Sequence, residues 1–441
     1  MLNNRLQELE EEGMPIRVGI VGAGRMGTGV ACQISRMKGM RAAILADIQL
    51  ENATAAFRLC GVKAKDVVVT DDLERAQLAI FEGKVVATRE KGIVTQVPID
   101  VIVEATGVPE VGAMVALEGI QSKKHIVMLN VETDVVVGPL LKRMADAAGV
   151  VYTLTIGDEP GAIAELYDFV VSLGMEAVCA GKSPFKPIRR EETPETLRRE
   201  ADRLGLNPKM LCSFRDGSKT DIEMAAVANG TGLVPDVPGM HGPQTTLADL
   251  PKVFSLKSQG GVLRRKGVVD FATSFLDKEG NTDRAKSVAP GVFVVFTTDH
   301  SQIRKDLEWL LMGSGPNYCL YRPYHLVGIE TPISIGRAAI YGEASLAPER
   351  GLVAEVATVA KKDLAEGEIL DGIGGFTVHG MIHRAEEARK ENLLPLGLTH
   401  GSRLKRSIKK GQAIRYDQVE LEDSILLQLR KIQDALFHKS E

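Results

Sequence analysis

The stretch that most constrains the fold of this chain runs from residue 16 to residue 47. A short run of branched apolar residues ends at Gly22, a periodic apolar stretch follows Gly27, and a second apolar run ends at Asp47. The order strand, glycine turn, helix, strand and acid predicts a dinucleotide-binding βαβ unit. A glycine turn that binds nothing is the alternative, and we favour the dinucleotide site because every part of the motif is present.

Each glycine of this turn has its own physical task. The first permits the tight turn, the second lets backbone N–H groups approach a pyrophosphate, and the third lets helix and strand pack closely. The following helix offers its N-terminal N–H groups to the phosphates, and the acid, twenty residues after the third glycine, is placed for a ribose 2′-OH. The predicted cofactor contacts of this stretch are Gly22, Gly24, Arg25, Met26, Gly27 and Asp47.

Strands and helices continue to alternate up to about residue 155, which predicts a parallel sheet with ligands beyond the carboxyl ends of its strands. Thr106, Gly107 and Asn130 each follow an apolar run and therefore lie at such ends. We expect them to line the nicotinamide half of the site, the alternative being that they are ordinary turn residues.

Length and composition constrain the number of domains, the partners and the cellular compartment. A chain of 441 residues is expected to form two or three domains. The net charge of −4 argues against nucleic acid as a partner, and no apolar run approaches the roughly 20 residues that span a bilayer. Five scattered cysteines without a CxxC pair are typical of a reduced cytoplasmic protein.

The fold class follows from the order of these patterns. We predict an α/β protein whose N-terminal domain, residues 1–155, is a doubly wound parallel Rossmann sheet. Residues 156–345 are predicted to form an α+β catalytic and oligomerisation domain. Residues 346–441 are rich in short strands and turns, and are predicted to form a small β module followed by a helix over residues 422–438.

The densest polar cluster lies at residues 213–232. Ser218 with Asp221 resembles a capping box that would start a helix at Lys219, and Glu223 would lie one turn further on the same face. A lysine in a first helical turn opposes the helix dipole, which depresses its pKa and suits a group that exchanges a proton. An exposed, salt-bridged helix end is the alternative, but the apolar residues that follow indicate a buried helix. The candidate residues here are Lys219, Asp216, Glu223 and, at the far end of the helix, Asn229.

Two further segments carry cations that could bind an anionic substrate group. Lys182, Lys186 and Arg189 lie in a proline-containing stretch that is predicted to be an exposed basic loop, and many such loops are merely solvated. Arg322 is a candidate clamp for a phosphate or carboxylate and His325 a candidate acid or substrate contact. An arginine stacked on a tyrosine is the alternative.

Several of these motifs together resemble a known group of enzymes. The chain is similar to homoserine-dehydrogenase-like oxidoreductases with a C-terminal SAF domain, a group that includes deoxyxylulose-phosphate-reductoisomerase-like enzymes of isoprenoid precursor synthesis. The phrases that resemble the SAF module itself are KKDLAEGEIL and SIKKGQAI. The other phrases that carry the resemblance are GIVGAGRMG, VIVEATG, IVMLNVE, GDEPGAIAELYDFV, DGSKTDIEMAAVANGTG and YRPYHLVGIE.

The resemblance implies NAD(P) as cofactor, a small anionic phosphate or carboxylate substrate, a homo-oligomer, and neither nucleic acid nor membrane as partner. Homoserine dehydrogenases carry a lysine directly after the asparagine that ends the equivalent strand, whereas Val131 follows Asn130 here. Reductoisomerase-like enzymes are expected to use NADPH, whose 2′-phosphate Asp47 would repel and Arg25 would attract. A divalent metal would assist a rearrangement, but no metal-ligand spacing in the sequence is diagnostic.

The favoured hypothesis is hydride transfer to the carbonyl of a small anionic substrate, with a rearrangement of a phosphosugar before it. Lys219 would supply the proton, Asp216 would orient Lys219 or relay its proton, and Glu223 would contact substrate hydroxyls or a metal. The alternatives are a dehydrogenase of homoserine or a related hydroxy acid, and a nucleotide-sensing scaffold without chemistry. We rank the scaffold last because of the charges packed at residues 216–223.

Overall fold

The computed structural model describes residues 1–437, so His438 of the predicted last helix lies outside the described residues. The chain forms two compact units. Unit 1 combines Met1–Gly161, Leu326–Ala347 and the segment from Ser424 onward, and unit 2 combines Ala162–His325 with Pro348–Asp423. The three-domain division made from the sequence stays a prediction, because compact units describe packing rather than independent folding.

A seven-stranded parallel sheet forms the centre of unit 1, and its strands lie in the order β3-β4-β2-β1-β5-β6-β7. The order reverses direction between β1 and β5, which creates the crevice where doubly wound sheets bind ligands. The predicted Rossmann fold is confirmed, although the short strand β4 had not been predicted. The strands are β1 (Ile16–Val21), β2 (Met40–Ala46), β3 (Val67–Val69), β4 (Val85–Thr88), β5 (Val101–Glu104), β6 (His125–Met128) and β7 (Tyr152–Leu154).

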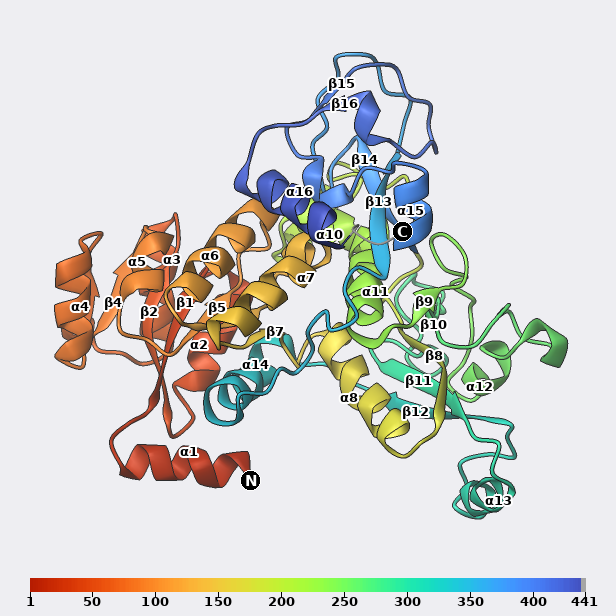
Figure 1. Ribbon diagram of the computed structural model, residues 1–441, viewed down its shortest axis with the longest axis horizontal. Helices are drawn as coiled ribbons and strands as arrows, with labels where there is room; N and C mark the ends of the chain where they lie inside the picture. Colours follow the sequence, from red (N-terminus) through yellow and green to blue (C-terminus); the bar gives the residue numbers. More distant parts are fainter. Residues whose placement is uncertain (438–441) are drawn as a thin grey trace. The chain divides into compact units, whose positions relative to one another are not determined.

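Helices cover this sheet on both faces (Figure 1). In α2, Val30, Ala31 and Ile34 recur at helical spacing and are buried in the core formed with β1. The helices of unit 1 are α1 (Leu2–Glu11), α2 (Arg25–Ile34), α3 (Leu50–Leu59), η1 (Ala64–Asp66), α4 (Leu73–Phe81), α5 (Lys91–Gln96), α6 (Pro109–Gln121), α7 (Val131–Ala148), α14 (Val327–Gly336), η3 (Arg337–Tyr341) and α16 (Ile425–Phe437).

Helix α16 packs on α6 and α7. One of its side chains hydrogen-bonds backbone groups of α7 next to a proline inside that helix. Pro139 lies inside α7 and cannot donate a backbone hydrogen bond. The buried amide of Gln433 accepts from Leu140 N at 3.1 Å and donates to Val136 O at 2.9 Å. These are the two backbone groups that a regular α-helix would join to each other, so a side chain from α16 is inserted into the hydrogen-bond ladder of α7.

Unit 2 contains a mixed five-stranded sheet in the order β12-β11-β8-β10-β9. Strands β8, β10 and β9 are parallel, whereas β11 and β12 run antiparallel to their neighbours. Its core includes Phe254 stacked on Phe293, with ring centroids 5.2 Å apart. The strands are β8 (Glu176–Lys182), β9 (Val234–Pro235), β10 (Val268–Phe271), β11 (Val292–Thr297) and β12 (Asn317–Arg322).

Unit 2 also contains helices that precede the small β module in the chain. Helix α8 (Glu159–Ser172) carries the chain out of the first segment of unit 1. The others are α9 (Arg198–Leu204), α10 (Pro208–Arg215), α11 (Ser218–Thr231), α12 (Leu250–Val253), η2 (Lys257–Gln259) and α13 (Ser301–Trp309).

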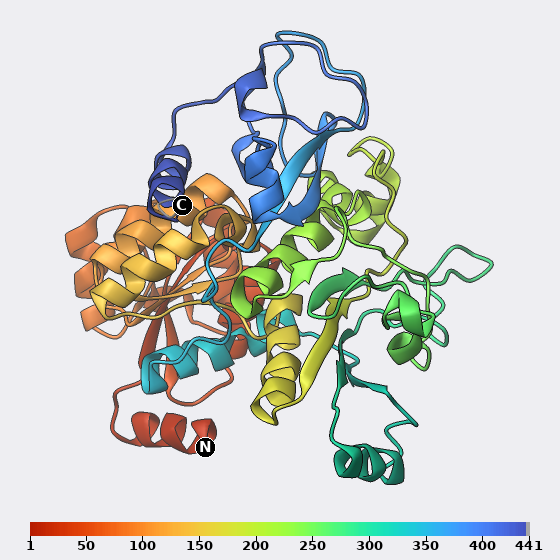
Figure 2. The same ribbon diagram turned by 45° about the vertical axis from the view of Figure 1, so that its right-hand side comes forward.

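The predicted small β module is present between residues 348 and 423, and its hairpin β13–β14 packs directly on α11 of the same unit (Figure 2). The module contains β13 (Ala354–Ala360), β14 (Val378–Arg384), α15 (Ala385–Lys390), η4 (Leu396–Leu398), β15 (Arg403–Leu404), η5 (Tyr416–Gln418) and β16 (Val419–Glu420). The predicted fold class, an α/β chain with a Rossmann sheet, an α+β region and small β elements, is therefore confirmed.

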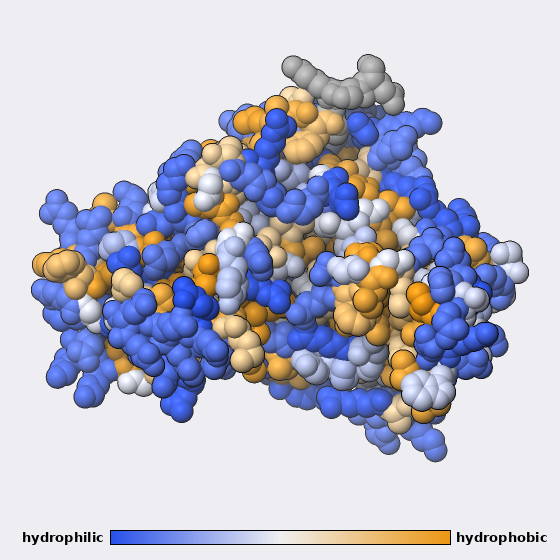
Figure 3. Space-filling view, turned by 60° about the horizontal axis from the view of Figure 1, so that its bottom comes forward, coloured by the Kyte–Doolittle hydropathy of each residue, from blue (hydrophilic) through white to orange (hydrophobic). Residues whose placement is uncertain are grey.

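Hydrophilic residues cover most of the face seen in Figure 3, and hydrophobic residues lie between them in small groups. Within residues 1–437, no helix combines the length and the apolar character needed to cross a bilayer.

Candidate active site

The glycine turn after β1 has the geometry that a pyrophosphate needs. Gly22 adopts a φ of +96°, and a Cβ on Gly27 would lie 1.9 Å from the carbonyl oxygen of Gly22. A Cβ on Gly24 would meet nothing within 4 Å. Arg25 and Met26 are exposed at the start of α2, whose first N–H groups have no partner within the helix. The turn therefore fits a dinucleotide pyrophosphate.

The carboxylate of Asp47 lies between this turn and the start of α3. Its Oδ2 accepts from Ala23 N at 2.8 Å, and its Oδ1 accepts from Gln49 N at 2.9 Å and from Asn52 Nδ2 at 3.2 Å. Three donors thus fix the carboxylate beside the glycine turn, where the ribose of a dinucleotide lies in folds of this type.

The carboxyl end of β5 carries a buried acid that sequence reasoning missed. Glu104 is fully buried and accepts hydrogen bonds from the amide and the hydroxyl of Thr106. Burial raises the pKa of the Glu104 carboxyl to about 7. A lone acid that ends an otherwise apolar strand was the available signal. Gly107, with a φ of +67° and open space around it, follows in the loop.

The side chain of Asn130 is engaged within the protein, and its contact with the cofactor stays a prediction. Its side chain is fully buried, where Oδ1 accepts from Thr133 N at 3.1 Å and Nδ2 donates to Val108 O at 3.1 Å. Asn130 therefore caps α7 and holds the loop after β5, because the first turn of α7 needs an acceptor. Its side chain supports the cofactor edge of the sheet from within.

In unit 2, two lysines converge on one glutamate. Lys182 is the last residue of β8, Lys219 lies in the first turn of α11, and Glu223 follows one turn later. The Nζ atom of Lys182 binds Oε2 of Glu223 directly, and Nζ of Lys219 lies 3.9 Å from Oε1. We call these three residues the lysine–glutamate cluster.

Burial distinguishes the members of this cluster. The side chains of Lys182 and Glu223 are 6% and 1% exposed, whereas that of Lys219 is 14% exposed. Buried charges are retained only where partners hold them. The predicted helix and the shared face of Lys219 and Glu223 are thus present, and the cluster can place a protonated amine at the partly open end of a buried helix.

Lys182 corrects one expectation about the basic stretch. It was predicted to lie in an exposed loop, but β8 extends to this residue because both of its neighbouring strands pair with it there. Lys186 instead pairs with Glu200 at 3.2 Å, and Arg189 with Glu192 at 3.7 Å. The three predicted substrate cations therefore bind three different glutamates.

Asp216 also differs from its predicted role beside Lys219. Its Oδ2 lies 2.8 Å from Nζ of Lys361, and its Oδ1 accepts from Ser218 N at 2.8 Å. Burial raises the pKa of the Asp216 carboxyl, and the Lys361 ammonium opposes that shift. The predicted Ser218–Asp221 capping box is absent, since Gly217 is the N-cap and Ser218 is the first helical residue. Its hydroxyl accepts from Gly380 N at 2.8 Å.

Asn229, predicted to contact substrate, is fully buried at the far end of α11. Its Oδ1 accepts from Val353 N at 2.8 Å and from Ala354 N at 2.9 Å. This oxygen therefore supports the start of β13, and the contact of Asn229 with substrate stays a prediction.

Arg322 and His325 lie at the end of β12 and in the segment that follows it. Arg322 pairs with Glu165 at 2.8 Å, and its guanidinium lies 4.7 Å from the ring centroid of Tyr324. The alternative of an arginine stacked on a tyrosine is thus the arrangement found. Nδ1 of His325 lies 3.0 Å from Pro290 O. Their contact with substrate stays a prediction.

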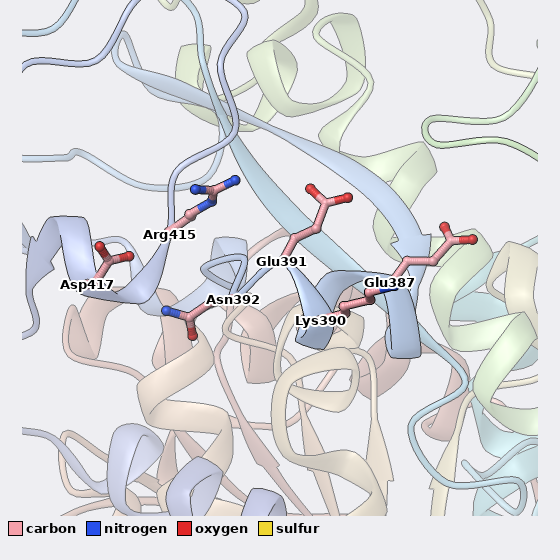
Figure 4. Close-up of a pocket in the computed structure, with 6 residues that line it drawn as sticks. All are labelled: Glu387, Lys390, Glu391, Asn392, Arg415 and Asp417. Carbon is pink, nitrogen blue, oxygen red and sulfur yellow. The ribbon is translucent and has the colours of Figure 1, made fainter.

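A surface hollow of about 690 Å³ lies elsewhere in unit 2, beside α15 (Figure 4). None of the predicted site residues lines it, so it does not define the candidate active site. Its lining residues are Glu387, Lys390, Glu391, Asn392, Arg415 and Asp417.

Comparison with protein families assigns a class to this arrangement. Residues 157–331 match the family described as oxidoreductase DRL, catalytic domain. The matched segment is less than half of the chain and includes the whole lysine–glutamate cluster. The dinucleotide-binding sheet and this match identify the chain as an NAD(P)-dependent oxidoreductase. No curated protein sequence matches the chain significantly.

Solved structures with a similar fold include several dehydrogenases. A homoserine dehydrogenase from Thiobacillus denitrificans is 15% identical over 91% of this chain and 98% of its own, with a TM-score of 0.43. A putative myo-inositol dehydrogenase from Sinorhizobium meliloti 1021 is 14% identical over 76% of this chain and 93% of its own, with a TM-score of 0.41. An NAD binding oxidoreductase from Klebsiella pneumoniae is 18% identical over 40% of this chain and 44% of its own, less than half its length, with a TM-score of 0.29. Likeness at this level leaves the substrate open.

Proposed function

We propose that this protein reduces the carbonyl group of a small anionic substrate with NAD(P)H, and that its activity is that of a deoxyxylulose-phosphate-reductoisomerase-like enzyme of isoprenoid precursor synthesis. The observation that carries the proposal is the lysine–glutamate cluster within the segment that matches the oxidoreductase DRL catalytic domain. A cluster of this kind places a proton donor and cationic charge together, which carbonyl reduction of an anion requires.

Each residue of the lysine–glutamate cluster has its own role in the proposed reaction. When the carbonyl oxygen develops negative charge, Lys219 stabilises it and transfers a proton to it, so that the carbonyl becomes an alcohol. Glu223, one helical turn after Lys219, pairs with its amine. Glu223 also forms an ion pair with Lys182, which fixes its position. Lys182 and Lys219 together favour a phosphate or carboxylate on the substrate. Bound NAD(P)H supplies the hydride that reaches the carbonyl carbon.

The cofactor contacts proposed for unit 1 follow from the geometry of its turn. The N–H groups at Gly24, Arg25 and Met26 bind the pyrophosphate, and Asp47 accepts from the ribose. The carboxylate of Asp47 disfavours the 2′-phosphate of NADP, while the exposed guanidinium of Arg25 attracts it. The choice between NAD and NADP is therefore part of the test.

The experiment is a substrate panel read by nicotinamide absorbance. The protein is incubated with NADPH or NADH and deoxyxylulose phosphate, with and without a divalent metal salt, and separately with homoserine and the oxidised cofactors. Cofactor consumption with the sugar phosphate is expected. Turnover of homoserine alone would replace the substrate class by that of a hydroxy-acid dehydrogenase. Tight cofactor binding without turnover of any substrate would favour the nucleotide-sensing scaffold.

The remaining partner assignments are also proposals. We propose a homo-oligomer in the cytoplasm with no nucleic-acid or membrane partner, and a SAF-like identity for the module within residues 346–441. Light scattering on the purified protein tests the oligomer, and a monomer at micromolar concentration would contradict it.

A further inference from the structure

Helix α11 presents two separate polar faces. With about 100° of rotation per residue, Ser218, Asp221 and Asn229 fall within an arc of about 80°. Lys219 and Glu223 centre on a direction about 140° away from the centre of that arc. Since the lysine–glutamate cluster occupies one face, the other face is available to fix the helix in position.

The hairpin β13–β14 holds the N-terminal half of that second face. The hydroxyl of Ser218 accepts from Gly380 N at 2.8 Å, and Oδ1 of Asp221 accepts from Ile382 N at 3.0 Å. The guanidinium of Arg190 binds Oδ2 of Asp221 at 2.6 Å and Gly380 O at 2.8 Å. Asp221 is fully buried, so a carboxylate there requires these partners.

The same hairpin holds the C-terminal end of the helix. The side chain of Asn229 receives the amides of Val353 and Ala354 at the start of β13, and the carbonyl of Asn229 receives the amide of Arg350 at 2.9 Å. Both ends of α11 are therefore tied to the hairpin or to the residues just before it, which restricts both sliding and rotation of the helix.

Lys361, the residue after β13, adds a buried charge to this arrangement. Its Nζ binds Oδ2 of Asp216 at 2.8 Å, Glu192 O at 2.8 Å and Gly375 O at 2.7 Å. An ammonium group has three N–H donors, and these oxygens account for them; Sγ of Cys212 is a further neighbour at 3.3 Å. Asp216 in turn receives the first amide of α11.

We propose that Lys361 and Asp221 are positioning residues that fix α11, and with it the amine of Lys219, so that the catalytic unit extends beyond the matched segment into residues 348–423. The inference deepens the proposed function and rests on the role given there to Lys219. It assigns the small β module a task within the same chain, namely support of the helix that carries the proton donor.

The test uses the full chain with Lys361→Met and, as matched control, Lys362→Met. Lys362 is the adjacent lysine, and it pairs with Glu368 at 2.8 Å on the exposed side of the module. The rate of Lys219 acetylation is measured across pH by peptide mass spectrometry, together with amide exchange in the first turns of α11. These two measurements require no substrate, so they decide the inference even if the proposed reaction fails.

For Lys361→Met we expect the pH profile of Lys219 acetylation to shift and exchange in the first turns of α11 to rise at least about tenfold, as for a locally opened segment. If the proposed reaction holds, kcat falls at least about tenfold while KM for the nicotinamide cofactor is unchanged. Lys362→Met should match the wild type in every measurement.

A folded Lys361→Met protein with the wild-type acetylation profile and wild-type exchange would overturn the inference, even if its thermal midpoint were lower. If Lys361→Met does not fold, Asp221→Asn takes its place, because asparagine keeps the shape and the acceptor for Ile382 N while removing the charge. A wild-type acetylation profile in folded Asp221→Asn would overturn the inference in the same way.

Discussion

The Nζ atom of Lys219 lies 3.9 Å from Oε1 of Glu223, one turn along a helix that is otherwise almost wholly buried. Helix α11 contains few charges, and Lys219 is the partly exposed one of this pair. An amine held in this way can deliver a proton in a fixed direction.

Replacing Lys219 with alanine is therefore expected to lower kcat by about 10²-fold or more, since general acid catalysis contributes on this scale. Cofactor affinity, measured by NADH fluorescence titration, should be unchanged. Lys278→Ala, which removes an exposed lysine of the same unit, serves as the control. Activity retained in Lys219→Ala would remove this residue from the mechanism.

Two glycines of the same turn should respond differently to one added methyl group. A Cβ on Gly24 meets nothing within 4 Å, so Gly24→Ala should fold normally yet raise Kd for NADH about tenfold by obstructing the pyrophosphate. A Cβ on Gly27 would lie 1.9 Å from Gly22 O, so Gly27→Ala should lower stability by about 1–3 kcal/mol. Thermal unfolding and fluorescence titration separate the two effects. Equal losses of stability in both variants would contradict this account of the turn.

Asp47 is expected to set cofactor preference. In Asp47→Asn the ratio of Kd for NADPH to Kd for NADH should fall about tenfold, because a negative charge near the 2′-phosphate is removed. Glu51→Gln removes an exposed acid in the first turn of α3 and is the matched control. A ratio that stays at the wild-type value in Asp47→Asn would place the ribose away from this carboxylate.

A buried carboxyl should make unit 1 sensitive to pH. Burial raises the pKa of Asp134 to about 7, although Tyr152 donates to it at 3.0 Å. An unfolded aspartate titrates near about 4. The folded state thus binds the proton more tightly, and its stability falls as pH rises from about 4 through about 7.

Asp134→Asn has no such proton to lose. The unfolding free energy of Asp134→Asn minus that of the wild type should therefore increase by up to about 3 kcal/mol from pH 4.5 to pH 8. The scale is about 1.4 kcal/mol per pKa unit. Asp146→Asn on the same helix, whose side chain is 57% exposed, should show no such gain. Denaturant unfolding at the two pH values measures the difference, and parallel pH profiles of wild type and Asp134→Asn would refute it.

Gln433 offers a test of how α16 supports α7. Gln433→Ala leaves Val136 O and Leu140 N without the buried amide that joins them, which should cost about 2 kcal/mol. Thermal unfolding measures this loss. The transition to follow is the one whose midpoint rises when NADH binds. Gln428→Ala, an exposed position on the same helix, should leave that midpoint unchanged. A loss in Gln428→Ala as large as in Gln433→Ala would contradict this account, because alanine is the better helix former and the exposed position lacks the inserted amide.

The Rossmann sheet could be predicted because its signals are local. The glycine turn, the acid after β2 and the apolar runs between them all lie within residues 16–47. The short strand β4 escaped prediction because three apolar residues, followed by a polar stretch, resemble many buried segments.

The partners of the candidate site residues could not be predicted in the same way. Asp216 pairs with Lys361, which lies 145 positions further along the chain. Asn229 accepts hydrogen bonds from the start of β13. Spacing in the sequence gives no information on such pairs. By contrast Lys219 and Glu223 are four residues apart, so helical periodicity alone placed them together.

The insertion of Gln433 into α7 has a consequence for how the protein is made. A ribosome that has just released the glycine turn and all seven strands of unit 1 has yet to synthesise unit 2 and then α16. Until that helix emerges, the proline interruption of α7 has no side chain to repair it. About 270 residues separate β7 from α16, so we expect α7 of the nascent chain to lack this contact until they have been translated.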